Sequence, residues 1–271
     1  MLHKGGADVA PRRTLSMTKL PAWRLARHAY LDVIANAQGL MRVGGPWLLL
    51  SWALLILGHL GVPLAGAAAD LTVAVGAAAI AVAWHRHILR NEPLTARFAP
   101  VDARVARYFV LTVMLALLIG VIPLAALLLT GARLDGETEG VGIELLLVPV
   151  LMAACIYVAM RLQLMFPATA IGDQTITPSR SWALTDGNGW RLVGGFVLAT
   201  LPVTVAVLAL ALLLGYLAEL TGSIVLAALA DLAAVANAWL QAPLIASFLS
   251  FAYLFFRQQA DLPRSQRGFL T

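Results

Sequence analysis

Six long apolar runs divide this chain and restrict it to one class of fold. Each run is long enough, or nearly long enough, to cross about 30 Å of hydrocarbon as an α-helix. Only 12% of the residues are charged, about half of what a soluble domain carries. The sequence therefore predicts an all-α protein, a polytopic transmembrane helical bundle of about six spans. The runs cover residues 47–65, 67–85, 108–130, 143–165, 192–218 and 223–256.

The runs indicate a single integral membrane domain over residues 21–256. We expect a basic, flexible N-terminus over 1–20 and a cytoplasmic tail over 257–271. The first twenty residues have no apolar core, so no cleavable signal peptide is expected and the first span would act as an uncleaved anchor.

The basic residues predict how the spans are oriented. Of the 19 Lys and Arg residues, all except Arg133 lie in residues 1–46, in alternate connections, just inside a span end, or in the tail. Basic residues are retained on the cytoplasmic side during insertion. Both termini are therefore expected in the cytoplasm, and a bacterial inner membrane fits this arrangement best.

Short interfacial helices are expected on the cytoplasmic side. Residues 21–42 repeat apolar side chains at helical spacing with basic residues between them, which predicts an amphipathic helix in the interface plane. A second such helix is expected over 101–107. Thr177 and Pro178 are typical of an N-cap followed by a first-turn proline, and Gly187 of a helix stop. A surface helix followed by a transmembrane hairpin would then repeat three times.

Aromatic residues gather near the predicted cytoplasmic span ends. We interpret them as an interfacial belt, because rings with an apolar body and a polar edge are stable at headgroup depth. The alternative is that they pack in the core. They are Trp47, Trp84, Tyr108, Phe166, Trp190, Tyr253 and Phe256.

The last apolar run is too long for one perpendicular span. As a straight helix it would measure about 50 Å. Pro243 lies inside it and frees a backbone carbonyl, so a kink or a break is expected there. Two short spans would place the Arg-bearing tail outside, against the charge pattern, so one long helix is the preferred alternative.

A candidate polar site lies within the spans. Asp231 in the last run would need a partner if it lay deep in the bilayer, and His59 of the first span is the simplest one. Alternatively, the helix protrudes and Asp231 lies at the outer headgroups. Asn237 and Gln241 share a helix face, where they would either bind a polar ligand or cross-link neighbouring helices.

No catalytic, metal or cofactor signature is present in the sequence. There is no H-E-x-x-H, G-x-S-x-G or phosphate-binding loop. His85 and His87 point to different faces of a helix, which disfavours a metal site. The lone Cys155 forms no internal disulfide and is interpreted as a packing residue.

Two cytoplasmic stretches carry a resemblance. One is Trp84-His85-Arg86-His87-Ile88-Leu89-Arg90-Asn91-Glu92, and the other runs from Arg161 through Phe166-Pro167-Ala168 to Ser181-Trp182-Ala183-Leu184-Thr185-Asp186-Gly187-Asn188-Gly189-Trp190-Arg191. The second resembles a pattern in bacterial six-span proteins, namely the YciC-like envelope proteins and the membrane domain fused to some glycerophosphodiester phosphodiesterases. The resemblance implies an inner-membrane protein of unknown activity. It does not imply phosphodiesterase chemistry, because the sequence contains no soluble catalytic barrel.

These stretches also supply a candidate interfacial motif for lipid headgroups. Trp rings can seat a short helix at the headgroup plane while Arg side chains meet lipid phosphates. An anchoring elbow explains the same residues as well as a binding site does. The motif consists of Trp84, His85, Arg86, Glu92, Arg180, Trp182, Asn188, Trp190 and Arg191.

Three function classes follow. The preferred one is a non-enzymatic envelope protein that scaffolds or regulates partners or organises lipid, because polar residues in the spans are sparse. The second is a transporter or permease component that uses the polar site of the last span. The third is a lipid-modifying intramembrane enzyme. The expected partners are anionic lipid headgroups and a further membrane protein. Nucleic acid is not expected, because the basic residues form collars rather than one patch.

Overall fold

The computed structural model describes residues 19–95, 99–129 and 144–261, and the regular structure in these ranges is entirely helical. Three short helices accompany six that are long and apolar enough to cross a membrane. The predicted all-α fold is confirmed, and its six apolar helices make this a multi-pass membrane protein. The long helices are α2 (Ala37–His59), α3 (Ala65–Arg90), α4 (Ala103–Leu129), α5 (Glu144–Leu162), α8 (Gly189–Thr221) and α9 (Ile224–Asp261). The short ones are α1 (Ala22–Ala35), α6 (Met165–Ile171) and α7 (Pro178–Leu184).

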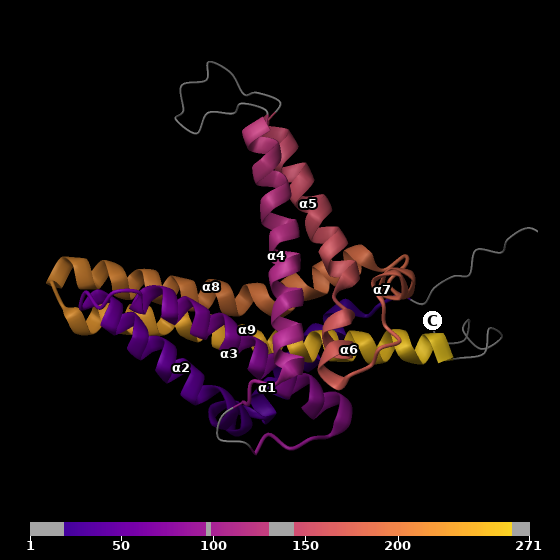
Figure 1. Cartoon of the computed structure of the whole chain (residues 1–271), viewed down its shortest axis with the longest axis horizontal. Coiled ribbons are helices and arrows are strands. Elements are labelled where there is room, and N and C mark those ends of the chain that lie inside the picture. The colour runs from indigo at the N-terminus through magenta and orange to yellow at the C-terminus, as the bar shows by residue number, and fades with distance from the viewer. Residues whose placement is uncertain (1–18, 96–98, 130–143, 262–271) are drawn as a thin grey trace, which may run out of the picture.

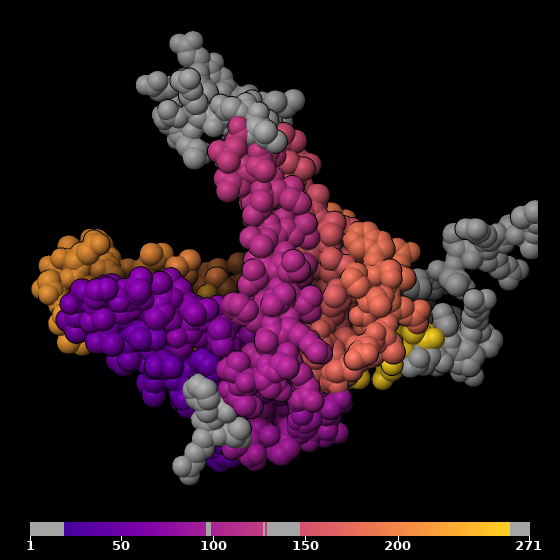
Figure 2. All heavy atoms as spheres, in the orientation of Figure 1, coloured from indigo at the N-terminus to yellow at the C-terminus, as the bar shows by residue number. Residues whose placement is uncertain are grey.

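Helices α2, α3, α8 and α9 lie side by side, and the hairpin of α4 and α5 diverges from them (Figure 1). Helices α1, α2, α3, α6, α7 and α8 all contact α9. Helices α4 and α5 pack against each other, and Figure 2 shows their hairpin standing clear of the remaining helices. We call the end where α1, α6 and α7 gather the basic end, because its connections carry most of the arginines. The ends near His59 and Thr221 form the opposite end.

The first surface helix is shorter than expected. The prediction of one helix over residues 21–42 is wrong over its C-terminal third, because α1 ends at Ala35. The Asn36 amide donates back to the Asp32 carbonyl and carboxylate, at 2.9 and 3.1 Å. This local bonding competes with helix continuation. Residues 37–46 instead begin the first span, which ends at His59 rather than at residue 65.

Residues 101–107 do not form a helix of their own, because α4 begins at Ala103. The Asp102 carboxylate accepts hydrogen bonds from the backbone N–H groups of Arg104 and Val105, at 2.9 and 3.0 Å, and so caps a helix that runs without a break into the span. The predicted threefold repeat therefore fails at its second unit. The third unit is present, since Thr177 caps α7 through the Arg180 N–H and Pro178 follows it.

The last apolar run is one helix. Helix α9 continues through Pro243 for 38 residues, about 57 Å. Of the two alternatives for this run, the single long helix is confirmed and the pair of short spans is wrong. Its C-terminal half lies in the core, where Phe248, Leu249 and Phe256 are at most 1% exposed.

The aromatic residues near the basic end fill the core instead of facing lipid. Only Trp190 of the predicted belt is well exposed, at 65%. Because the helices converge at this end, residues at the span boundary point into the space between helices, and the belt prediction is wrong for the others. The buried members are Trp47, Trp84, Tyr108, Phe166, Tyr253 and Phe256.

Candidate functional site

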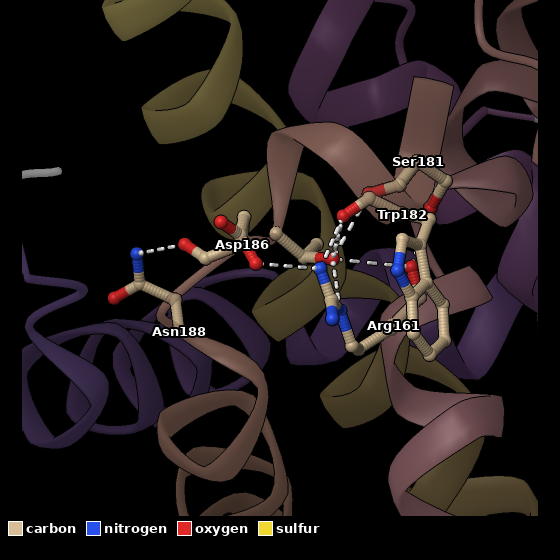
Figure 3. A network of polar contacts seen from close by, with 6 residues as sticks. Arg161, Ser181, Trp182, Asp186 and Asn188 are labelled. Atoms are coloured by element: carbon tan, nitrogen blue, oxygen red, sulfur yellow. Dashed lines mark hydrogen bonds and ion pairs between the residues drawn. The ribbon is translucent and has the colours of Figure 1, made fainter. Parts of the chain in front are cut away.

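The buried guanidinium of Arg161, near the end of α5, organises the elbow between α5 and α8 (Figure 3). Its Nε donates to the Thr185 hydroxyl at 3.2 Å, and its Nη2 donates to the Trp182 carbonyl. The same nitrogen lies 3.2 Å from an oxygen of Asp186. The Arg161 Cζ sits 3.9 Å from the centroid of the Trp182 ring, a cation–π contact. One buried cation thus fixes the whole turn after α7.

Further bonds attach this elbow to its neighbours. The Ser181 hydroxyl donates to the Arg161 carbonyl at 2.6 Å, which ties α7 to α5. Gly187 adopts φ +69°, a left-handed conformation that favours glycine, and so turns the chain toward α8. The Asn188 side-chain oxygen then accepts the Leu20 N–H at 2.7 Å, so the segment before α1 is held at the same place.

A second network attaches α1 to the core. One carboxylate oxygen of Asp32 accepts from the indole N–H of Trp84 at 2.8 Å and from the hydroxyl of Ser247 at 2.7 Å. Trp84 and Ser247 are fully buried on α3 and α9. A charge-assisted bond of this kind is stronger than a neutral one. Asp32 therefore holds the surface helix against two spans.

A third network lies one residue further along α3. The fully buried His85 places Nδ1 2.7 Å from the Ser250 hydroxyl and Nε2 3.4 Å from the Tyr108 hydroxyl. These contacts join α3, α9 and α4. His85 and Trp84, both expected at headgroup depth, are instead part of the helix–helix packing.

The end of α3 carries a partly buried ion pair. Arg86 donates from Nε and Nη2 to the two carboxylate oxygens of Glu92, at 2.7 and 2.8 Å. The hydrogen bond from Arg86 lowers the pKa of Glu92 below its ordinary value, against the opposing effect of partial burial. This carboxylate therefore stays ionised at neutral pH.

The loop after α6 is attached to α9 in a similar way. The Tyr253 hydroxyl donates to Asp173, and Arg257 lies 3.7 Å from the same carboxylate. Burial raises the pKa of Asp173, but hydrogen bonds from Thr175 and Tyr253 and the charge of Arg257 outweigh it, so the pKa lies below its ordinary value.

The remaining members of the predicted headgroup motif divide between structure and surface. Arg191 donates to the Leu20 carbonyl at 3.2 Å and thus helps to hold the elbow. Arg180, Trp182 and Trp190 are exposed at the surface of the same elbow, with Trp182 39% exposed. This arrangement favours an anchoring elbow with an outward face of Trp and Arg side chains.

The predicted intramembrane site separates into two parts. His59 and Asp231 come together, with His59 Nε2 2.8 Å from Asp231 Oδ2, but the pair lies at the opposite end and His59 is 64% exposed there. Gln241 donates to the Thr200 carbonyl at 3.0 Å and to the Thr204 hydroxyl at 2.7 Å.

The two parts serve different helix contacts. Asn237 lies 3.5 Å from Gln241 on the same helix, and so adjoins the cross-link that Gln241 makes to α8. Asp231 and Gln241 are ten residues apart on α9, about 15 Å. The structure therefore does not bring the four predicted residues into one site.

Sequence reasoning missed the two residues that organise the basic end. The basic-residue pattern places Arg161 only just inside a span end, although an arginine beside a Trp-, Thr- and Asp-containing motif is a usable signal. Asp32 was not singled out, and its partner Ser247 is 215 positions away in the chain, so no local spacing connects them.

No cluster of three His, Cys, Asp or Glu side chains suited to a metal ion occurs within residues 19–95, 99–129 and 144–261. Comparison of the chain with protein-family models, curated proteins and solved structures gave no match. The resemblance to YciC-like proteins therefore stays a prediction.

Proposed function

We propose that this protein is a non-enzymatic component of a bacterial inner membrane, with both termini in the cytoplasm, that organises anionic lipid headgroups around its basic end. The observation that carries the proposal is the outward face of α1. Trp23, Leu31 and Ile34 are 66%, 50% and 70% exposed there. Arg24 and Arg27 are exposed beside them. Apolar and basic side chains on one exposed helix face are typical of a helix in the headgroup layer.

The opposite face of α1 supports the same role. Ala26, Ala29 and Val33 are buried against the bundle, and Asp32 is bonded to Trp84 and Ser247. The helix therefore presents its Trp and Arg side chains from a fixed position. Arg180 and Trp190, exposed on the elbow, add further basic and aromatic side chains to the surface of the basic end.

The geometry favours this function over transport. The strongest candidates for a transport site were Asp231 and Gln241. The first pairs with His59 at the opposite end, and the second cross-links α8 and α9. A substrate path needs polar groups that converge near the bilayer midplane, and these two groups do not converge.

The test compares the lipids that copurify with the full chain. Arg24→Gln together with Arg27→Gln should reduce the ratio of retained phosphatidylglycerol to neutral lipid, because each basic residue near the surface contributes about 1 kcal/mol to anionic-lipid attraction. The matched control is Val62→Glu together with Thr221→Glu, which changes the net charge equally at the opposite end. An unchanged ratio in the α1 variant, or an equal loss in the control, would refute the proposal.

A further inference from the structure

A cavity of about 360 Å³ opens at the basic end between α2, α3 and the segment that leads into α4. This volume lies within the range of small-ligand sites. Its inner wall is apolar and includes the buried residues Val43, Ala79, Val82 and Val105. Among the residues that the structure describes, its charged lining consists of Arg86, Glu92, Asp102 and Arg104.

The four charged side chains form two opposite-charge pairs. Arg86 holds Glu92 through two bonds, and Arg104 Nη1 lies 3.3 Å from Asp102 Oδ2. Their exposures are 22% and 39% for the first pair and 42% each for the second, so all four are reachable from outside. These four residues together have no net charge.

This balance selects among ligands. A simple anion that drew either arginine away would leave a carboxylate without its partner, at an energetic cost. A simple cation that drew either carboxylate away would leave an arginine without its partner. A ligand that carries both charges avoids this cost, because it offers a new partner to each member of a pair. Each guanidinium also has five N–H donors, and Glu92 uses two of those on Arg86.

We infer that this cavity binds a zwitterionic phosphate–ammonium group, the chemistry of a phosphoethanolamine headgroup, with the phosphate at Arg86 and Arg104 and the ammonium at Glu92 and Asp102. The inference goes beyond the proposed function, because it adds a zwitterionic headgroup in one cavity to the anionic headgroups around the basic end. The apolar wall matches the glycerol ester region of a lipid. A soluble phosphoethanolamine compound carries the same charges, and the experiment separates the two sources.

The experiment places the full chain in nanodiscs with equal amounts of phosphatidylethanolamine and phosphatidylglycerol and measures retained lipids by native mass spectrometry. The wild type should retain phosphatidylethanolamine in addition to the phosphatidylglycerol that the proposed function requires, and the retention of phosphatidylethanolamine reports the cavity. Arg86→Gln and Arg104→Gln should each weaken this retention roughly tenfold, the size expected for loss of one charge-assisted contact. Arg257→Gln is the matched control, because it breaks an ion pair at the same end without lining the cavity.

Glu92→Gln gives a readout that a purely structural role would not produce. Loss of its charge leaves Arg86 uncompensated, so retention should shift from phosphatidylethanolamine toward phosphatidylglycerol. An equal loss of both lipids in this variant would overturn the inference. The midpoint of thermal unfolding identifies any variant that has failed to fold, and Arg104→Gln, at an exposed position, keeps the test informative if Arg86→Gln unfolds.

The outcomes distinguish this inference from the proposed function. Retention of phosphatidylglycerol without phosphatidylethanolamine by the wild type would overturn the zwitterion site and leave the anionic-headgroup function in place. Retention of phosphatidylethanolamine alone would support the zwitterion site and overturn the anionic-headgroup function. Retention of neither lipid would overturn both. Competition by soluble glycerophosphoethanolamine as strong as that of the lipid would support the zwitterion chemistry and assign the site to a soluble compound.

Discussion

Helix α3, in the core, and helix α4, of the α4–α5 hairpin, show that burial decreases as hydropathy rises. In the most apolar stretch of α3 the mean hydropathy is 1.8 and 44% of the residues are buried, whereas in α4 the mean hydropathy is 2.7 and only 6% are buried. In a soluble protein the more apolar helix would be the inner one. In a bilayer, the lipid tails are as apolar as leucine, so apolar side chains gain little free energy by moving from lipid into the protein core. Here the highest hydropathy marks lipid contact, and small or polar side chains mark the core.

The basic end shows what replaces hydropathy as a source of specificity. Its helices are joined by Arg161, Asp32 and His85, each bonded to groups on other elements. Bonds of this kind require one geometry, whereas apolar contacts tolerate many. We therefore expect the basic end to be the rigid part of the molecule.

The same truncation made in both regions is the largest test of this contrast. Leu249→Ala, in the core of α9, should lower the free energy of unfolding by about 2–5 kcal/mol, because a cavity remains. Leu117→Ala, 52% exposed on α4, should change it by less than about 1 kcal/mol. Chemical unfolding in detergent micelles, followed by Trp fluorescence, measures both. Equal losses would contradict the contrast.

Removing the Arg161 guanidinium tests the polar part of the basic end. Arg161→Met should lower the free energy of unfolding by about 2–4 kcal/mol, since three hydrogen bonds and the contact with the Trp182 ring are lost together. Arg180→Met, on the exposed surface of the same elbow, is the control and should be nearly neutral. The same unfolding measurement applies. A neutral Arg161→Met would show that the elbow does not depend on this cation.

A pair of adjacent glycines tests the packing of α2 on α9. A Cβ at Gly44 would lie 2.1 Å from Trp239 Nε1, while a Cβ at Gly45 would meet nothing within 4 Å. Gly44→Ala should therefore destabilise the protein by about 1–3 kcal/mol, and Gly45→Ala should be neutral or slightly stabilising. Thermal unfolding of the two variants side by side decides the point. If they behave alike, α2 and α9 do not approach closely here.

The smallest expected effect is a dependence on pH. The pKa of Asp173 is lowered in the folded state, so its contribution to stability is present above the pKa of the unfolded chain and is lost as the pH falls through the folded value. Wild-type stability should therefore decrease below about pH 4. Asp173→Asn should make this decrease shallower. Identical profiles of unfolding midpoint against pH for the wild type and Asp173→Asn would refute the role of Asp173. The lowered pKa of Glu92 contributes equally to both proteins and does not affect the comparison.

The sequence predicts the spans well because the bilayer sets their length. A segment that crosses hydrocarbon must satisfy its backbone hydrogen bonds internally, so each apolar run had to form a helix. The basic charge of the tail was enough to assign the long run through Pro243 as one helix. The helix ends were less predictable. They depend on local bonds such as the Asn36 amide to Asp32, which apolar patterns do not encode.

The site was less predictable than the fold. Trp84 and Trp190 lie at the same boundary, and their sequence surroundings do not distinguish a core ring from an interfacial one. That difference arises from how the helices converge, which depends on contacts such as that between Trp84 and Ser247, 163 positions apart. The pairing of His59 with Asp231 could be predicted because each is an isolated polar side chain within or near a span, and such a side chain needs a polar partner.

The length of α9 makes membrane thickness a mechanical variable for this protein. A rod of about 57 Å in a layer of about 30 Å must lean or project, and six of the other helices touch it. A thinner membrane would increase the tilt of α9 and reorient the helices packed against it. The α4–α5 hairpin contacts the other helices mainly near its base, so its tilt would be set independently of α9.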